Sequence, residues 1–180
     1  MSDASSSLPT LETRDLDVEI AARRLVEGLS FKISPGEFLA VLGENGVGKT
    51  LTMHTLAGLR APGAGSILLK GRELATWPRR ELAGVLGLLA QSSEDPFPST
   101  VLETALIGRH PHIEFWRWES DRDLGIARGA LADVDLTDRE GRSVETLSGG
   151  ERRRLAIATV LTQDPVLYLL DEPTNHLDPH

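Results

Sequence analysis

The sequence contains no cysteine among its 180 residues. Disulfide bonds, thiol nucleophiles and cysteine-ligated metal sites are therefore excluded for this chain, and its redox compartment stays open. Long apolar runs are also missing: FLAVL, VLGLLA and VLYLL fall far short of the ~20 residues that span a bilayer. No charged segment precedes an apolar one near residue 1, so we expect neither a signal peptide nor direct membrane insertion.

An excess of basic residues is absent as well. Asp and Glu number 27 and Lys and Arg number 19, which gives a formal net charge of −8. Because non-specific nucleic-acid binding needs clustered Lys and Arg, we expect no nucleic-acid partner. A cytosolic location follows as the default, and any membrane association would require a partner protein.

Apolar periodicity indicates several strands. Residues 16–20 and 29–33 alternate between apolar and polar side chains, as half-exposed strands do. The nearly continuous apolar runs at 37–42, 85–90 and 166–170 predict strands buried on both faces. A further strand is expected at SILLK, and the small, polar residues before Leu11 predict a disordered tail, residues 1–10.

Helix-start signals lie between these strands. Ser or Thr followed three residues later by Glu or Asp predicts a capping box at three places. Buried strands alternating with helices predict an α/β fold with a parallel sheet, and the largely helical stretch at about 92–162 predicts an inserted subdomain. The predicted helices run from about Thr50 to Leu59, from Thr100 to near Gly108, from Ser120 to about Asp133, and from Ser148 to about Thr162.

A glycine-rich loop, GENGVGKT, follows the run at 37–42 and opens the first predicted helix. Glycines let backbone N–H groups turn toward a phosphate, and the helix N-terminus adds a positive dipole end. The lysine would neutralise the β/γ-phosphates of a nucleotide, and the threonine hydroxyl could ligate Mg²⁺. We therefore predict ATP binding by Gly43, Glu44, Asn45, Gly46, Val47, Gly48, Lys49 and Thr50.

Two carboxylates close the last apolar run. Asp171 at the end of a buried strand can hold Mg²⁺, and Glu172 can polarise an attacking water. Gln91 ends another predicted strand, where its amide can face the metal and the water. We predict Glu172 and Gln91 as catalytic residues and Thr50, Gln91 and Asp171 as metal ligands.

The stretch LSGGE predicts a second anion site. Ser148 and Glu151 form the capping box, while Gly149 and Gly150 occupy the first helical turn, where N–H groups are exposed. One chain thus carries two phosphate-binding helix starts. If both cannot reach one nucleotide within a chain, they would meet across a symmetric dimer.

From residue 11 onward, these motifs resemble those of the ATP-binding cassette (ABC) ATPases: GENGVGKT is similar to their Walker A loop, Gln91 to the Q-loop, LSGGE to the signature, VLYLLDE to Walker B with its catalytic glutamate, and NHLD to the D-loop. The resemblance implies a single ABC ATPase domain at 11–180 with a P-loop NTPase core, a mostly parallel sheet and an N-terminal antiparallel β element. It also implies a dimer around two ATP molecules, in which Ser148 and Gly150 contact the nucleotide of the other cassette and Asp178 lies at the interface.

A narrower resemblance concerns the stretch FPSTVLETALIGRHPH, which is similar to cassettes of bacterial importers for iron–siderophores, haem or cobalamin. Such cassettes are peripheral on the cytoplasmic face of the cell membrane, where the helical subdomain docks onto a permease. His110 and His112 could suggest a metal site, but no third ligand lies nearby, so a surface loop is favoured.

The chain also departs from the family pattern. Ile20 stands where the family usually stacks adenine on an aromatic residue, and a further strand and a switch histidine follow the D-loop in the family. His176 and His180 come too early for that role. The chain therefore resembles a C-terminally truncated cassette, and we expect residues 1–180 alone to leave a gap in the sheet, to fold marginally and to hydrolyse ATP poorly.

Two other readings stay open. One is a soluble ABC ATPase of translation or DNA repair, although that class usually carries a second cassette or a coiled-coil insertion. The other is a fragment that binds nucleotide without turnover. A nucleotide kinase is disfavoured because it would not need LSGGE.

Overall fold

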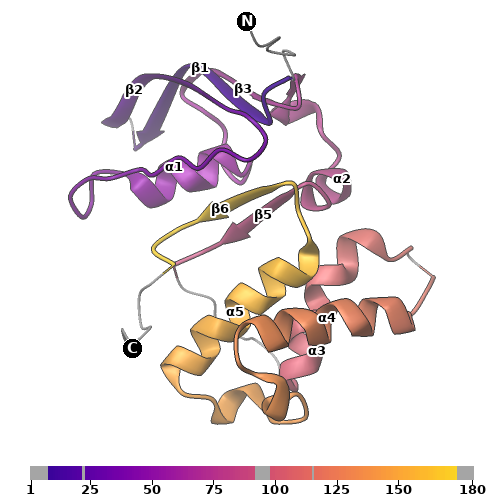
Figure 1. The fold of residues 1–180 in the computed structure, drawn as a ribbon. Coiled ribbons are helices and arrows are strands. Elements are labelled where there is room, and N and C mark those ends of the chain that lie inside the picture. Colours follow the sequence, from indigo (N-terminus) through magenta and orange to yellow (C-terminus); the bar gives the residue numbers. More distant parts are fainter. Residues whose placement is uncertain (1–7, 22, 92–97, 115, 174–180) are drawn as a thin grey trace, which may run out of the picture. The chain divides into compact units, whose positions relative to one another are not determined.

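The structure, a computed structural model, describes residues 8–21, 23–91, 98–114 and 116–173 (Figure 1). The chain divides into two compact units, Met1–Pro78 and Arg79–His180. The predicted single domain at 11–180 stays a prediction, and most of the predicted tail lies outside the described residues.

The first unit is built on a four-stranded sheet in the order β2-β1-β3-β4. Its strands are β1 (Leu11–Ile20), β2 (Arg23–Ile33), β3 (Ala64–Leu69) and β4 (Arg72–Glu73), and every pairing is antiparallel. The predicted N-terminal antiparallel element is therefore confirmed, with longer strands than the periodicity indicated. The fully buried side chains of this sheet include Leu11, Leu16, Val18 and Leu69.

Helix α1 (Lys49–Leu56) belongs to the same unit and packs beside β1 (Figure 1). It buries Thr52, Thr55 and Leu56. Hydroxyls of both buried threonines donate to helix carbonyls four residues back, at 2.9 and 2.8 Å, so the polar atoms on this face are satisfied. The predicted helix at 50–59 is confirmed, although it ends earlier.

The predicted strand at 37–42 is wrong for this structure. The segment is irregular, and Phe38 and Leu42 are 88% and 90% exposed. A strand exists only through hydrogen bonds to a neighbour, and no described strand pairs with this segment. An apolar run alone therefore misled the prediction, because it reports hydrophobicity and not the presence of a partner strand.

The second unit contains a parallel pair of strands, β5 (Leu86–Leu89) and β6 (Leu167–Leu170). The strand predictions at 85–90 and 166–170 are confirmed, but β6 buries only alternate residues and leaves Tyr168 and Leu170 partly exposed. Three helices, α3 (Val101–Leu106), α4 (Asp121–Asp133) and α5 (Gly149–Gln163), pack on one another, and α5 also contacts β5 (Figure 1). The shorter described elements are η1 (Leu74–Thr76) in the first unit and α2 (Arg79–Ala83), η2 (Ile107–His112), η3 (Thr137–Arg139) and η4 (Val144–Thr146) in the second.

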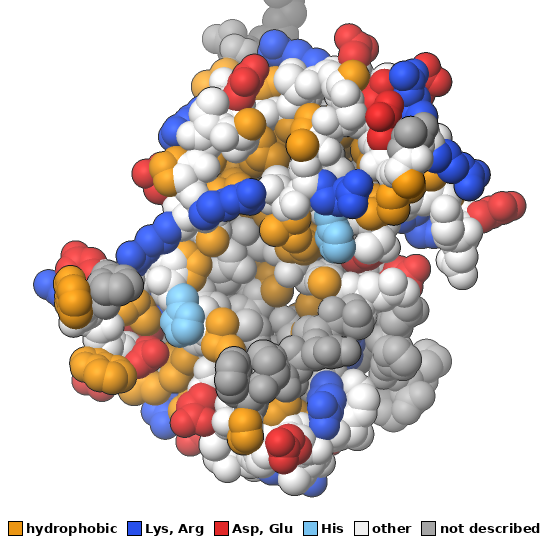
Figure 2. All heavy atoms as spheres, turned by 180° about the vertical axis from the view of Figure 1, so that it is seen from behind, with side chains coloured by type: hydrophobic (Ala, Val, Ile, Leu, Met, Phe, Trp, Pro, Cys, Tyr) orange, Lys and Arg blue, Asp and Glu red, His pale blue; other side chains and the backbone are white. Residues whose placement is uncertain are grey.

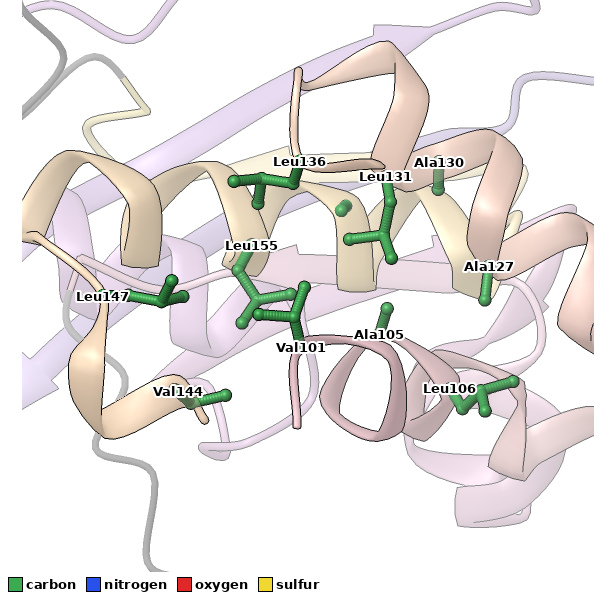
Figure 3. Packing of buried hydrophobic residues seen from close by; sticks show 11 residues of the cluster. Val101, Ala105, Leu106, Ala127, Ala130, Leu131, Leu136, Val144, Leu147 and Leu155 are labelled. Atoms are coloured by element: carbon green, nitrogen blue, oxygen red, sulfur yellow. The ribbon is translucent and has the colours of Figure 1, made fainter. Parts of the chain in front are cut away.

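All three predicted capping boxes are present. Thr100, Ser120 and Ser148 each accept a hydrogen bond from the backbone N–H three residues on, and that residue's carboxylate accepts one in return. Helix α5 ends at Gln163, and its C-cap residue Asp164 has a left-handed backbone (φ 51°) and precedes a proline. The three helices share one core, in which α3, α4 and α5 interdigitate (Figure 3); its buried residues are Val101, Ala105, Leu106, Ala127, Ala130, Leu131, Leu136, Val144, Leu147, Leu155 and Ala158.

The surface mixes charge types. Acidic and basic side chains are both spread among hydrophobic ones on the face drawn in Figure 2. Trp116 and Trp118 are each 89% exposed. Over the described part of the chain, no helix is long and apolar enough to cross a membrane.

Candidate functional site

The Gly43–Thr50 loop joins the irregular segment to α1. Gly46 (φ 80°) and Gly48 (φ 111°) both have left-handed backbones, which an L side chain adopts at a cost. A β-carbon on Gly48 would also lie 3.1 Å from the Leu25 Cβ. The loop conformation therefore depends on glycine at these two positions.

Lys49 folds back over this loop. Its Nζ donates to the backbone carbonyls of Gly43 and Glu44, at 2.7 and 2.9 Å. The N-cap of α1 is Gly48, which supplies no side-chain cap, and the first turn contains no acidic residue. Within this unit the ammonium group and an uncapped helix start therefore lie in one short loop, an arrangement that attracts an anion.

The ends of β5 and β6 bring three predicted residues together in the second unit. The parallel register pairs Leu89 with Leu170, so Gln91 and Asp171 follow neighbouring strand ends. Gln91 Nε2 donates to Glu172 Oε2 at 2.7 Å. This bond uses the amide nitrogen of Gln91, so it leaves the amide oxygen available as an acceptor.

Asp171 is 3% exposed, and its Oδ2 is buried with no hydrogen-bond partner among the described residues. A buried, unpartnered carboxylate oxygen is costly, which suits a group whose partner is a bound cation. The oxygen donors of Asp171, Gln91 and Thr50 are of the kind that Mg²⁺ prefers. Within the described ranges no group of three or more His, Cys, Asp or Glu residues could hold a metal ion.

Glu172 has an uncommon backbone conformation. Its φ is 47°, in the left-handed region that non-glycine residues seldom occupy. Such conformations cluster at functional sites because the surrounding structure has to hold them in place. Here the holding group was not predicted: the buried Arg153 donates to backbone carbonyls on both sides of Glu172 and to its own.

Ser148, Gly149 and Gly150 form the start of α5 in the same unit. The Ser148 oxygen accepts from the Glu151 N–H at 3.2 Å, and Glu151 Oε2 accepts from the Ser148 N–H at 2.8 Å. The backbone N–H of Ser148, then its side chain, lowers the pKa of Glu151, so this carboxylate is ionised at neutral pH. The α5 start therefore has its own carboxylate in place, unlike the α1 start, and an anion there would have to tolerate that charge.

The remaining predicted positions lie on exposed parts of the chain or outside the described residues. Glu44, Asn45 and Val47 are exposed in the loop before α1, and Ile20 is 42% exposed. His112 Nε2 lies 2.7 Å from the carbonyl oxygen of Gln163, so this ring packs on α5. The NHLD motif, including Asp178, and the histidines at 176 and 180 lie outside the described residues.

Sequence relatives match most of the chain. The profile of the ABC transporter family matches residues 26–175. The hemin import ATP-binding protein HmuV of Gloeobacter violaceus is 42% identical over 175 residues, which cover 93% of this chain and 63% of that protein. The ferric enterobactin transport ATP-binding protein FepC of Escherichia coli is 36% identical over 175 residues, 97% of this chain and 64% of that protein. The chain thus spans less than two thirds of the length of these curated relatives.

Solved structures give the same result for the fold. A metal-chelate type ABC transporter in an inward-facing conformation matches with a TM-score of 0.78 at 32% identity, covering 95% of this chain and 62% of that one. CbiO1 of Clostridium perfringens, part of an ABC transporter complex, matches with a TM-score of 0.79 at 26% identity, covering 95% and 68%. The loop, the strand-end residues and the capped helix start, together with these matches, place the chain in the ABC transporter family, with the P-loop NTPase fold of its ATP-binding domains.

Proposed function

We propose that this protein, in its full-length form, binds and hydrolyses ATP to drive import of haem or an iron–siderophore. The observation that carries the hydrolytic part is the Gln91–Glu172 hydrogen bond beside the buried Asp171, whose Oδ2 has no hydrogen-bond partner among the described residues. A carboxylate held beside an amide at a strand end suits a group that orients and activates water, which nucleotide binding alone does not require.

The proposed chemistry divides between the two units. In the first, the Lys49 ammonium and the α1 start would bind the β/γ-phosphates of ATP. In the second, Glu172 would accept a proton from the attacking water, with its carboxylate oriented by Gln91. Thr50 is the Mg²⁺ ligand that we propose in the first unit, and Asp171 and Gln91 are those that we propose in the second; the ion would supply charge neutralisation for the phosphates when bound.

Assembly follows from the two anion-binding helix starts. We propose a head-to-tail dimer in which Ser148, Gly149 and Gly150 of one cassette approach the ATP held by Gly43–Thr50 of the other. A membrane permease would be the further partner, and the protein would lie on the inner face of the cell membrane through it. The names of the relatives favour haem and siderophores over cobalamin as the solute class, since hemin and ferric enterobactin appear in them.

Solute uptake tests this proposal. A strain lacking the gene would be complemented with wild type, with Glu172→Gln, or with the control Glu145→Gln, which changes an exposed carboxylate away from the strand ends. We expect wild type and the control to restore uptake of labelled haem or ferric siderophore, and Glu172→Gln to fail. Normal uptake of haem, siderophores and cobalamin by the deletion strain would overturn the transport role and favour a soluble ABC ATPase.

A further inference from the structure

Arg153 lies in the second turn of α5 and is 7% exposed. Its guanidinium group donates to four backbone carbonyls: Nη1 to Ala90 at 2.6 Å, Nη2 to Asp171 at 2.9 Å and to Glu172 at 2.7 Å, and Nε to Pro173 at 3.2 Å. Most of the N–H donors of the guanidinium group thus bind two chain segments, one at Ala90 and one at 171–173.

These two segments lie just beyond the point where the parallel strands stop pairing. The Asp171 N–H donates to the Leu89 carbonyl at 2.9 Å, at the end of the β5–β6 ladder. Arg153 then binds the carbonyl that precedes Gln91 on one segment and the carbonyl of Glu172 on the other. The guanidinium group therefore continues the cross-link between the strands into the two residues that the proposed chemistry uses.

The electrostatic setting fits a holding role. Burial lowers the pKa of Arg153, and the nearby carboxylates of Asp171 and Glu172 oppose that shift. A buried cation is tolerated when carbonyl dipoles and opposite charges surround it. The planar guanidinium fork also fixes the angles between its acceptors, which a lysine ammonium does not.

We propose that Arg153 is a positioning residue for ATP hydrolysis: it holds Gln91 and Glu172 in their hydrogen-bonded arrangement and joins both to the helix that begins at Ser148. This inference rests on the proposed function. It implies that the position of Glu172 follows that of α5, so that whatever binds at the α5 start acts on the catalytic carboxylate through Arg153.

Arg109 provides a matched control. It is also buried, at 8% exposed, and binds Asp123 Oδ1 at 2.9 Å and the Thr162 carbonyl at 3.1 Å, with no bond to the segments at Gln91 or Glu172. Removing either arginine leaves buried acceptors unpaired and destabilises the fold. Only the loss of Arg153 would also release the catalytic residues.

The first measurement compares Arg153→Gln and Arg109→Gln in the full-length protein, at a temperature where both are folded by thermal melting. We expect Arg153→Gln to lower kcat by about tenfold or more while the Kd for ATP changes by less than about threefold. Arg109→Gln should keep kcat within about twofold of wild type. If Arg153→Gln does not fold, Arg153→Lys, which keeps the charge but not the fork, replaces it. Equal kcat effects for the two positions would reduce Arg153 to a structural residue and overturn the proposal.

A second measurement separates this inference from the proposed function. Amide hydrogen exchange of Asp171 and Glu172 should accelerate by about tenfold or more in Arg153→Gln and stay near wild type in Arg109→Gln. If wild type hydrolyses no ATP but this exchange pattern appears, the proposed function fails while Arg153 still holds the segment. Unchanged exchange in Arg153→Gln would show that Arg153 does not hold it, whatever the ATPase activity.

Discussion

At the scale of single residues, local signals indicated the candidate site residues but not the side chain that holds them in place. The loop motif is enough to identify Gly46 and Gly48, and the end of an apolar run is enough to identify Asp171 and Glu172. Each of these residues acts through its own position in the backbone, which the sequence shows directly. Arg153 could not be found this way. It is the middle of three consecutive arginines, and only the packing of α5 decides which of them turns inward.

Lys49 gives the first prediction at this scale. Lys49→Ala removes the ammonium that now lies against the Gly43 and Glu44 carbonyls. Because charge-assisted hydrogen bonds are worth about 1.5–3 kcal/mol, ATP affinity should fall about tenfold or more in calorimetry on the full-length protein. Lys32→Ala, which changes an exposed lysine near Glu12, should bind ATP normally. Equal affinity for wild type and Lys49→Ala would contradict the loop assignment.

Asp123 gives a pH-dependent prediction. Hydrogen bonds from the Ser120 side chain and from Arg109 lower its pKa from 3.8 to about 2. A lowered carboxylate pKa stabilises the fold above the unfolded pKa, and this contribution is lost as pH falls from 3.8 through about 2. It is on the order of 1–2 kcal/mol after allowance for solvent screening.

The corresponding variant is Asp123→Asn. It should be less stable than wild type in urea unfolding at pH 7, and the stability difference should shrink as the pH falls from 3.8 toward about 2. Asp121→Asn, which removes an exposed carboxylate from the same helical turn, is the control and should lose less stability than Asp123→Asn at pH 7. A constant difference between Asp123→Asn and wild type over this pH window would rule out the linkage.

At the scale of elements, capped helices were predictable and one strand was not. A capping box is complete within four residues. The sequence around Thr100, Ser120 and Ser148 therefore predicts a helix start at each position, whatever the rest of the fold is. The segment at 37–42 needs a partner strand, which no local pattern supplies. The extent of β1 and β2 was also underestimated, because edge and bulge residues break the alternation that marks a strand.

Two glycines test the packing of these helices. A β-carbon at Gly108, in η2, would meet the backbone oxygen of Thr159 in α5, whereas one at Gly125, inside α4, meets nothing within 4 Å. Gly108→Ala should therefore destabilise the fold by about 1–3 kcal/mol through overpacking. Gly125→Ala should stabilise it by about 0.5–1 kcal/mol, because alanine loses less backbone entropy in a helix.

Thermal and urea unfolding of the two alanine variants measure whether the free energy of unfolding falls in Gly108→Ala and rises in Gly125→Ala. Both substitutions add one methyl group to the same unit, so each serves as the control for the other. A stabilised Gly108→Ala would mean that η2 and α5 do not approach each other as closely as the structure indicates.

At the scale of the whole molecule, the family and fold class were predictable because five motifs occur in a fixed order along one chain. The arrangement of the two helix starts around a nucleotide was not, since the proposed arrangement involves a second cassette. This leaves assembly as a prediction. In the full-length protein, Glu172→Gln with ATP and Mg²⁺ should elute as a dimer in size-exclusion chromatography, because ATP still binds and its hydrolysis no longer releases the partner.

Two controls sharpen that experiment. Glu172→Gln combined with Lys49→Ala should stay monomeric, because the nucleotide that joins the cassettes is lost. Glu145→Gln should elute as wild type does under the same conditions. A Glu172→Gln protein that remains monomeric with saturating ATP would speak against the head-to-tail dimer.

In the proposed mechanism, Glu172, held beside Gln91 and Asp171, activates water for ATP hydrolysis. Steady-state phosphate release by the full-length protein, with and without Mg²⁺, tests it most directly. We expect Mg²⁺-dependent turnover on the order of 1 s⁻¹ or above for wild type and Glu145→Gln, and a loss of about 10²-fold or more for Glu172→Gln. Glu172→Gln turnover within about threefold of wild type would contradict the account, because a residue that activates water cannot be neutralised at so small a cost.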